Sequence, residues 1–599
     1  MIYHCEDHTC NYWDEGEKLP ERCPQCGRKL LRANEADMTG DDWTALGNTL
    51  WNAEASDKKR MVDCFRKAAY LGSAWGVCNL GICMEQGNGV EADPVQAFWL
   101  YQQAVEMGSL NAVCCLGVCY QYGIGTAPDA KQAAELYCKA AEYGSPRGQM
   151  LLARAFHDGI GVEADAAEAV HWVRAAAYQR YGEGMHRLGV CYEYGDGVEQ
   201  NWEHAVHWFR EAAESGVSVA MTDLGYCYEK GCGVEQSWEQ AFSWYRRSAE
   251  CGNPVSMSNL GLCYKRGYGV EQNWQEAIKW YEQGAQCGDL QSMHNLACCY
   301  EGGEGVEQNE DRAFYWYRRS AEGGHGSAMC NLGRCYKRGY GVEQNWQEAV
   351  KWYEQGAQCG NLQSMHNLAC CYEHGEGVEQ NMTEAIRWYA AAAEGGNADD
   401  MYELGWQYDH GEGVEQDMKK AICWYERAAE QNHPAAMNSL GECYAMGRGV
   451  PRDLETAMEW YRRAAELGEA MADYNMGWHL EQAGKLSEAY AHYRKAADGN
   501  DDSAWWALGR FYENGVVVAQ DGKEARRCYE TGEKLGSVKC KMRLARCKLL
   551  GIGGRRAKKA GLDLCRQALE LAKESSEKED YGYEAEMNLL RRTIAENES

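Results

Sequence analysis

Four cysteines near the start of the chain have the residue type and spacing of a metal site. Cys5 and Cys10 are separated by four residues, and Cys23 and Cys26 by two, with a glycine directly after the second pair. Two pairs of thiolates form the ligand set of a tetrahedral structural zinc ion, and a Cys-x2-Cys turn lets two sulfurs reach one ion at about 2.3 Å. The sequence therefore predicts a structural zinc site made by these four cysteines.

The neighbouring residues leave the ligand set open. His4 and His8 are close enough in sequence to replace a cysteine, and the alternative without metal is four free thiols in an unfolded tail. A segment of about 40 residues with so few aliphatic side chains needs a staple to fold, which favours the metal. The segment resembles a zinc ribbon or rubredoxin-like knuckle, so iron remains possible beside zinc. Its acidic composition favours contact with protein over nucleic acid.

Two histidine–cysteine pairs also have spacing that suits a metal. His294 and Cys298, and His366 and Cys370, lie four residues apart and hence on one face of a helix. Neither pair has a second ligand pair in view, so polar residues lining a surface are the favoured interpretation.

The sequence contains no catalytic motif that would indicate an enzyme. There is no phosphate-binding loop after a strand and no Gly-x-Ser-x-Gly elbow, and acidic and basic residues recur in every repeat. Catalysis needs one preorganised constellation, so we predict a non-enzymatic protein and keep a hydrolase-like enzyme as an alternative.

These side chains are positioned by a sequence repeat. An anchor leucine or methionine recurs every 36 residues along most of the chain, with one step of 34 residues at the start and one of 32 near the end. The fifteen anchors are Leu46, Leu80, Leu116, Leu152, Leu188, Leu224, Leu260, Leu296, Leu332, Leu368, Leu404, Leu440, Met476, Leu508 and Leu544.

Each repeat has the pattern of two amphipathic helices. In one repeat, Leu332, Cys335 and Tyr336 follow the i, i+3, i+4 spacing of a helix face, and a second helix is predicted to begin after an Asn345 N-cap. Between them, Gly339 and the glycine two residues later are predicted to end the first helix with backbone angles that favour glycine. Neither helix buries its apolar side alone, so the repeats must stack.

The recurring motifs Leu-Gly-x-x-Tyr, Gly-x-Gly-Val and Ala-x-x-Trp-Tyr-x-x-Ala-Ala-Glu resemble the Sel-one-like repeat family, which is related to the tetratricopeptide repeat. The resemblance implies an all-α fold, a right-handed α/α solenoid of about 15 helix-turn-helix repeats, here preceded by the zinc-binding knuckle. We predict a knuckle at 1–32, a linker at 33–42, the repeat solenoid at 43–573 and a C-terminal capping helix at 574–599. Residues 265–300 and 337–372 differ at two positions, which indicates duplication of a two-repeat block.

The net charge and the cysteines of the chain indicate which classes of partner it binds and in which cellular compartment it lies. The net charge is −29, a field that repels phosphate backbones and anionic lipids, so we predict neither nucleic acid nor membrane as a partner. A cysteine follows the anchor by three residues in ten repeats and is predicted to be a reduced core thiol. With no apparent signal segment, these thiols favour a cytoplasmic protein. A tryptophan twenty residues after the anchor is also predicted to pack in the core.

The family resemblance places the first helix of each repeat along a concave groove, and residues that vary between repeats there are candidates for binding. A basic stripe in an acidic protein favours a partner protein or peptide with acidic residues. The function predicted is an interaction scaffold or adaptor, and the alternative is a structural spacer without a groove ligand. The oligomeric state stays open. The candidate partner-binding residues are Lys265, Arg266, His294, Arg334, Lys337, Arg338, His366, Tyr402 and Trp406, with Tyr194 and Tyr226 as further aromatic anchors.

Overall fold

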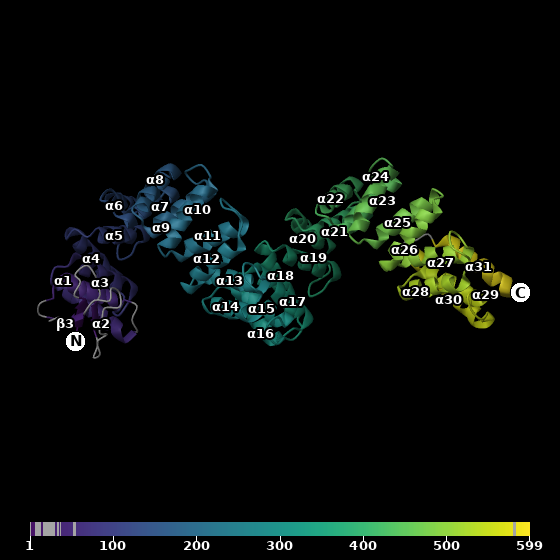
Figure 1. The fold of residues 1–599 in the computed structure, drawn as a ribbon, viewed down its shortest axis with the longest axis horizontal. Coiled ribbons are helices and arrows are strands. Elements are labelled where there is room, and N and C mark those ends of the chain that lie inside the picture. The colour runs from purple at the N-terminus through teal and green to yellow at the C-terminus, as the bar shows by residue number, and fades with distance from the viewer. Residues whose placement is uncertain are drawn as a thin grey trace. The chain divides into compact units, whose positions relative to one another are not determined.

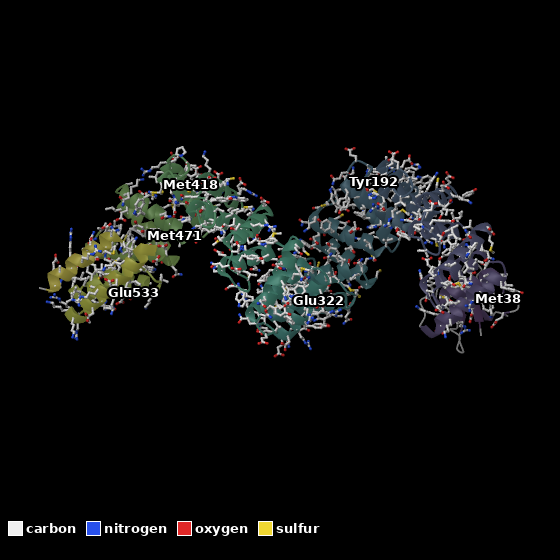
Figure 2. The ribbon with its side chains drawn as sticks, turned by 180° about the vertical axis from the view of Figure 1, so that it is seen from behind. Met38, Tyr192, Glu322, Met418, Met471 and Glu533 are labelled. Atoms are coloured by element: carbon white, nitrogen blue, oxygen red, sulfur yellow. The ribbon has the colours of Figure 1, made fainter. Side chains whose placement is uncertain are left out.

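The computed structural model describes residues 2–5, 13–15, 30–32, 35, 38–51, 55–578 and 583–598. The chain divides into two compact units, Met1–Asn309 and Glu310–Ser599, and each is described by itself. Figure 1 colours them from purple at the N-terminus to yellow at the C-terminus. Figure 2 adds the side chains, with Met38 and Tyr192 labelled in unit 1 and Met418 and Glu533 among those labelled in unit 2.

Unit 1 begins with three short strands, which form a sheet of order β2-β1-β3 with both outer strands antiparallel to β1. The strands are Ile2–Cys5 (β1), Trp13–Glu15 (β2) and Leu30–Arg32 (β3). The helices are Gly40–Thr49 (α1), Ala55–Tyr70 (α2), Ala74–Gln86 (α3), Pro94–Glu106 (α4), Leu110–Tyr122 (α5), Ala130–Glu142 (α6), Pro146–Asp158 (α7), Ala166–Tyr178 (α8), Gly182–Tyr194 (α9), Trp202–Glu214 (α10), Ser218–Lys230 (α11), Trp238–Glu250 (α12), Pro254–Arg266 (α13), Trp274–Gln286 (α14) and Leu290–Gly302 (α15).

Unit 2 is built from helices throughout the part that the structure describes. They are Glu310–Glu322 (α16), Gly326–Arg338 (α17), Trp346–Gln358 (α18), Leu362–His374 (α19), Met382–Glu394 (α20), Ala398–His410 (α21), Met418–Glu430 (α22), Pro434–Met446 (α23), Leu454–Glu466 (α24), Ala470–Gln482 (α25), Leu486–Asp498 (α26), Asp502–Asn514 (α27), Gly522–Lys534 (α28), Val538–Leu550 (α29), Lys558–Lys578 (α30) and Glu584–Glu598 (α31). The helices α1 to α30 alternate as first and second helices of the repeats, so the predicted helical repeat solenoid is confirmed.

The helix ends follow the sequence signals. The Asn345 side chain caps α18 by accepting a hydrogen bond of 3.1 Å from the Glu348 backbone N–H. Helix α17 ends at Gly339, whose φ of +77° is in the left-handed region, and Gly341 has φ +63°. The predicted glycine turn is therefore confirmed. Between α25 and α26 the Gly-x-Gly-Val sequence is missing, and the connection shortens to residues 483–485.

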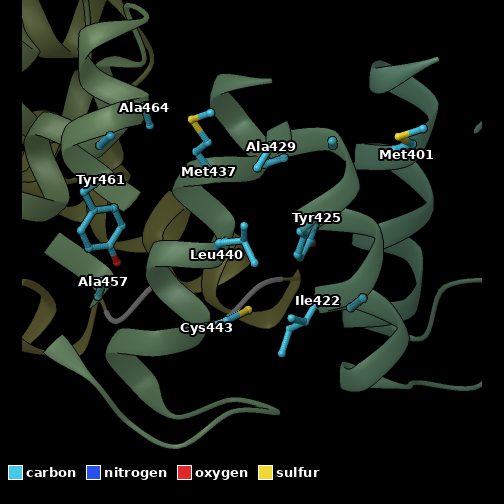
Figure 3. Packing of buried hydrophobic residues seen from close by; sticks show 14 of the residues in the cluster. Met401, Ile422, Tyr425, Ala429, Met437, Leu440, Cys443, Ala457, Tyr461 and Ala464 are labelled. Atoms are coloured by element: carbon cyan, nitrogen blue, oxygen red, sulfur yellow. The ribbon is translucent and has the colours of Figure 1, made fainter. Parts of the chain in front are cut away.

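A buried tyrosine of the second helix fills the centre of most repeats. Figure 3 shows Tyr425 and Tyr461 packed with the anchor Leu440 and with Cys443, all of them almost completely buried. The residue after the anchor is often glycine, and this lets the ring approach the first helix. A Cβ added at Gly225, for example, would lie 2.6 Å from the Tyr245 ring.

The hydroxyl of this tyrosine links the two helices of its repeat. In at least seven of the described repeats it donates a hydrogen bond to the side chain five residues after the anchor, and in six of these seven the acceptor is a carboxylate. The pairs are Tyr101–Glu85 (2.6 Å), Tyr137–Gln121 (2.7 Å), Tyr245–Glu229 (2.8 Å), Tyr389–Glu373 (2.6 Å), Tyr425–Asp409 (3.5 Å), Tyr493–Glu481 (2.7 Å) and Tyr529–Glu513 (2.8 Å).

The tryptophan that precedes this tyrosine is placed differently from the prediction. The nine tryptophans from Trp172 to Trp460 are only half-buried and pack against the edge of the core. Arginine side chains cover several of their outer faces: the Arg247 guanidinium lies 4.4 Å from the Trp244 ring, and that of Arg427 lies 4.2 Å from Trp424. A cation over an indole face is favourable at a partly exposed site. The core position belongs to the tyrosine because one residue turns the helix by about 100°.

The ten cysteines that follow the anchor by three residues are all buried, as predicted. No cysteine between Cys64 and Cys565 that the structure describes forms a disulfide. Burial raises the pKa of several of these thiols, for instance that of Cys83 to about 11, which favours the protonated and unreactive form.

The last helix, α31, packs on α29 and α30. Glu586 accepts two hydrogen bonds from the Arg543 guanidinium, at 2.6 and 2.7 Å, and Met587 and Leu590 are buried. Within the described residues, every helix is too short or too polar to cross a membrane.

Candidate binding surface

The first helices of unit 1 expose one line of side chains, which we call the first-helix face. Its residues stand five and one before the anchor and two and six after it, the i, i+4, i+7, i+11 spacing of one helix side. For α7, α9, α11 and α13 they are Arg147, Leu151, Arg154 and Asp158, then Glu183, Arg187, Val190 and Tyr194, then Val219, Asp223, Tyr226 and Lys230, and then Val255, Asn259, Leu262 and Arg266.

Part of this face is apolar although it is exposed. We define the apolar strip as Tyr194, Val219, Tyr226, Val255 and Leu262, which come from the three consecutive first helices α9, α11 and α13. Tyr194 is 73% exposed and Val255 is 51% exposed. Single exposed apolar residues are ordinary, whereas several of them on one face are typical of a contact surface. Asp223 and Asn259 stand between the apolar residues of α11 and of α13.

Polar contacts between repeats fix the helices under the strip. His186 of α9 lies 2.7 Å from the Asp223 carboxylate of α11. The hydroxyls of Thr222 on α11 and Ser256 on α13 lie 2.6 Å apart, and both side chains are buried. The backbones that carry the strip are therefore held together by contacts below the surface.

The predicted basic residues of unit 1 divide into two kinds. The Lys265 ammonium lies 2.9 Å from the Glu304 carboxylate of the next repeat and 5.2 Å from the Trp274 ring, so it holds two repeats together. Arg266 is exposed at the end of α13, beside the apolar strip, with no ion pair to any described residue. His294 is half-buried on α15, with its Nε2 3.8 Å from the Cys298 sulfur.

The same division occurs in unit 2. Lys337 pairs with Glu376 at 3.5 Å and lies 4.9 Å from the Trp346 ring, which repeats the arrangement of Lys265. Arg338 is exposed at the end of α17, and Arg334 is half-buried one turn earlier. The sequence predicted these cations as one basic stripe, and in the structure both lysines form ion pairs within the fold. The two terminal arginines remain candidates for contact with a partner.

The other candidates in unit 2 are partly engaged by the protein itself. The Tyr402 ring stacks on His433 with ring centroids 5.0 Å apart, and Trp406 stacks on His410 at 4.3 Å. Burial raises the pKa of the Tyr402 hydroxyl. His366 Nδ1 lies 2.8 Å from the Asp400 carboxylate, which is fully buried, and His366 Nε2 lies 3.6 Å from the Cys370 sulfur.

The Asp400 carboxylate, with a smaller contribution from Cys370, raises the pKa of His366 from its usual value near 6.5 to about 10. Because the folded-state pKa is raised, this histidine stabilises unit 2 fully below about pH 6.5, and that contribution fades as the pH rises through 10. We expect Asp400→Asn to return the His366 pKa toward 6.5, measured by an NMR pH titration of the imidazole. Titration near 6.5 in the unmodified chain would contradict the pairing.

One feature of unit 1 was missed by the sequence analysis. Val173 occupies the position where neighbouring repeats have Tyr137, Phe209 or Tyr245, and a cavity of about 350 Å³ lies beside it. Its lining comes from α7, α8, α9 and the turn that follows α9. The signal was present in the sequence as a valine where tyrosine or phenylalanine recurs.

The metal prediction falls almost entirely outside the described residues. Cys10, Cys23 and Cys26 are not described, and Cys5 is known only as the last residue of β1, paired in register with Leu30 of β3. In the remaining described chain, no three His, Cys, Asp or Glu side chains gather as metal ligands would, and this applies to the surroundings of His294 and His366.

Comparison with known proteins identifies the repeat. The sequence profile of the Sel1 repeat matches thirteen segments, at residues 76–109, 112–145, 146–181, 182–217, 218–253, 254–289, 290–325, 326–361, 362–397, 398–433, 434–469, 470–501 and 504–537. No curated protein sequence matches the chain significantly.

A solved structure agrees with the match. The crystal structure of a protective antigen present in uropathogenic Escherichia coli strains, described as displaying an SLR fold, is 32% identical and covers 75% of this chain and 97% of its own, with a TM-score of 0.51. A Sel1 repeat protein from Oxalobacter formigenes is 30% identical over 41% of this chain and 96% of its own, with a TM-score of 0.38. With profile matches along most of its length, the chain belongs to the Sel1 repeat family.

Proposed function

We propose that this chain is a protein-interaction scaffold and that the first-helix face of unit 1 binds a partner protein or peptide. Repeat solenoids of this type are typical of interaction scaffolds, and they present long surfaces made by equivalent helices. The observation that carries the proposal is the apolar strip, in which five exposed apolar side chains lie on the same face of three consecutive first helices.

The charges beside the strip suggest the character of the partner. Arg266 extends it at the end of α13, and its guanidinium can take a carboxylate in two parallel hydrogen bonds. Aromatic and aliphatic anchors surrounded by such polar residues form the usual energetic centre of an interface. The expected partner segment therefore has apolar side chains and an acidic residue near Arg266. A spacer without a ligand would have no use for a clustered apolar strip.

A photo-crosslinking experiment tests this proposal. With a benzophenone amino acid at Leu262, in cells that naturally express the chain, we expect adducts with a defined partner, because this side chain stands in the strip. The matched control carries the same amino acid at Lys279, which is exposed on the second helix α14 of the same repeat. Arg266→Glu should weaken the Leu262 adduct. Equal adducts from the two positions would exclude the strip as the contact surface.

The N-terminal segment carries a second proposal, a structural zinc site at Cys5, Cys10, Cys23 and Cys26 that orders the knuckle. Within the described residues, an antiparallel three-stranded sheet with Cys5 as the last residue of its central strand is compatible with such a site. A bound zinc would stabilise the fold of a segment that has few aliphatic side chains.

Metal analysis of the purified full chain tests the second proposal. We expect about one zinc per chain, lost when Cys23 and Cys26 are both replaced by serine. The control replaces Cys251 and Cys287, exposed cysteines of the solenoid, and should keep the metal. A metal-free chain would refute the site, and iron in place of zinc would reassign it.

A further inference from the structure

We propose that the cavity beside Val173 in unit 1 is a binding pocket for an aromatic side chain of a partner peptide, with a carboxylate next to the ring. The cavity is lined by residues that belong to three known positions of the repeat: Ala153 directly follows the anchor, His157 stands five residues after it, and Val173 takes the place of the buried tyrosine. In several other repeats, for example that of Tyr137, a tyrosine ring spans the space between these positions.

The neighbouring repeats show what fits there. In the repeat before, a Cβ added at Gly117 would lie 2.5 Å from the Tyr137 ring, and the Tyr137 hydroxyl donates to Gln121 at 2.7 Å. The ring thus occupies the space between the residue after the anchor and the residue five after it. In the Val173 repeat the ring is absent, and Ala153 and His157 stand where the preceding repeat has Gly117 and Gln121. Ala369 packs with Tyr389 in another repeat, so an alanine after the anchor admits the ring, and the cavity lies at the place of a missing aromatic side chain. At about 350 Å³ it is within the usual range of ligand pockets.

The floor and the rim differ in chemistry. Met150, Ala169, Val170 and Cys191 join Val173 in an apolar floor. The rim consists of charged side chains from the first-helix face and the adjoining turn, so the pocket opens on the surface already proposed to bind a partner. The rim residues are Arg154, His157, Asp158, Glu183, Arg187 and Asp196.

One rim cation is not used by the protein. Arg154 pairs with Asp158 at 3.3 Å, and His157 lies 2.6 Å from Asp158 and 3.2 Å from Asp196. Arg187, half-buried on α9, makes no hydrogen bond or ion pair with any described residue. A guanidinium at the mouth of an apolar pocket favours a ligand that places a carboxylate there while its ring enters.

This inference rests on the proposed function for its partner peptide, but small aromatic probes test the pocket without that peptide. The full chain is labelled with ¹³C at its methionine methyl groups, and the Met150 signal is assigned with Met150→Leu. The probes are N-acetyl-tyrosine, its amide and N-acetyl-leucine. We expect the two tyrosine probes to shift the Met150 signal saturably, and N-acetyl-leucine to bind at least about tenfold more weakly, because only the ring fills the cavity.

Two variants locate the binding. Val173→Tyr fills the cavity with the family's own side chain, so it should abolish the shift and raise the melting temperature, which also shows that the variant folds. Phe209→Tyr places a tyrosine at the same position of the next repeat, where a ring is already present, and this variant should bind the probes like the unmodified chain. Arg187→Gln should weaken N-acetyl-tyrosine by about tenfold and leave its amide unchanged.

Persistent binding in Val173→Tyr would overturn the pocket, and equal affinity for the leucine probe would overturn its aromatic character. Equal loss of the acid and the amide in Arg187→Gln would overturn the role of the carboxylate. A pocket that binds these probes while Leu262 yields no adduct would leave the aromatic site standing without the wider interaction surface. An adduct at Leu262 without binding of the probes would retain the first-helix face as an interaction surface and reject the aromatic site.

Discussion

Tyr245→Ala is expected to destabilise the repeats around α11, α12 and α13 by about 3–5 kcal/mol, the usual effect of removing a buried aromatic ring. Tyr245 is 1% exposed, its ring lies against Gly225, and its hydroxyl donates to Glu229 at 2.8 Å. Hydrogen exchange of the amides in these helices measures the effect locally, which matters because a repeat array need not unfold in one step.

Two variants separate the contributions at this position. Tyr245→Phe keeps the ring and removes the hydroxyl, so it should cost only about 1 kcal/mol. Trp244→Ala removes the larger neighbouring ring, which is half-buried under Arg247, and should cost less than Tyr245→Ala. A larger effect from Trp244 than from Tyr245 would mean that the core is assigned to the wrong aromatic residue.

The second large effect is expected at the glycine turn, where Gly233→Ala should cost about 3 kcal/mol or more. Gly233 has φ +69°, and an added Cβ would lie 2.4 Å from the backbone oxygen of Trp202, the first residue of α10 in the preceding repeat. The substitution therefore combines an unfavourable backbone conformation with a collision against a backbone atom that cannot rotate away.

Gly231 provides the matched control within the same turn. Its φ is +74°, but an added Cβ would meet its nearest neighbour, the Gln236 Cβ, at an ordinary 3.4 Å. Gly231→Ala should thus cost only the left-handed backbone penalty of about 1–2 kcal/mol. The two variants are compared by urea unfolding, with hydrogen exchange of the amides in α10 and α11 as the readout. Equal destabilisation by both substitutions would show that the contact with Trp202 is unimportant.

The repeat and its helices were predictable because the signals recur. The 36-residue spacing, the i, i+3, i+4 pattern and the paired glycines each determine local structure, and because they recur in most repeats they reinforce one another. The core position predicted for the tryptophan was wrong in depth: Trp244 is half-buried, whereas Tyr245 is buried. Both residues are apolar and adjacent, and the side of a helix that faces the core depends on the neighbouring repeat.

The candidate surface was harder to predict because charge in a sequence does not reveal its partner. Lys265 and Lys337 looked free, yet each pairs with a glutamate 39 residues later, one repeat plus three residues along the chain. The cavity at Val173 was visible as a departure from the repeat, but only the packing around Ala153 and His157 shows that the surroundings keep the space open. The apolar strip could not be predicted either, because the sequence does not show which of its apolar side chains are exposed.

Because the helices contact mainly their neighbours along the chain, the protein can begin to fold while it is being synthesised. In the described chain, each helix packs mainly against the helix before or after it, or against the next but one. The fold therefore has a low contact order, and such topologies form quickly because little chain must be ordered before a contact is made. A repeat can pack as soon as it and its successor have left the ribosome, while the remaining repeats are still being translated. Nascent chains stalled at successive anchors would then acquire protease resistance in steps of one repeat.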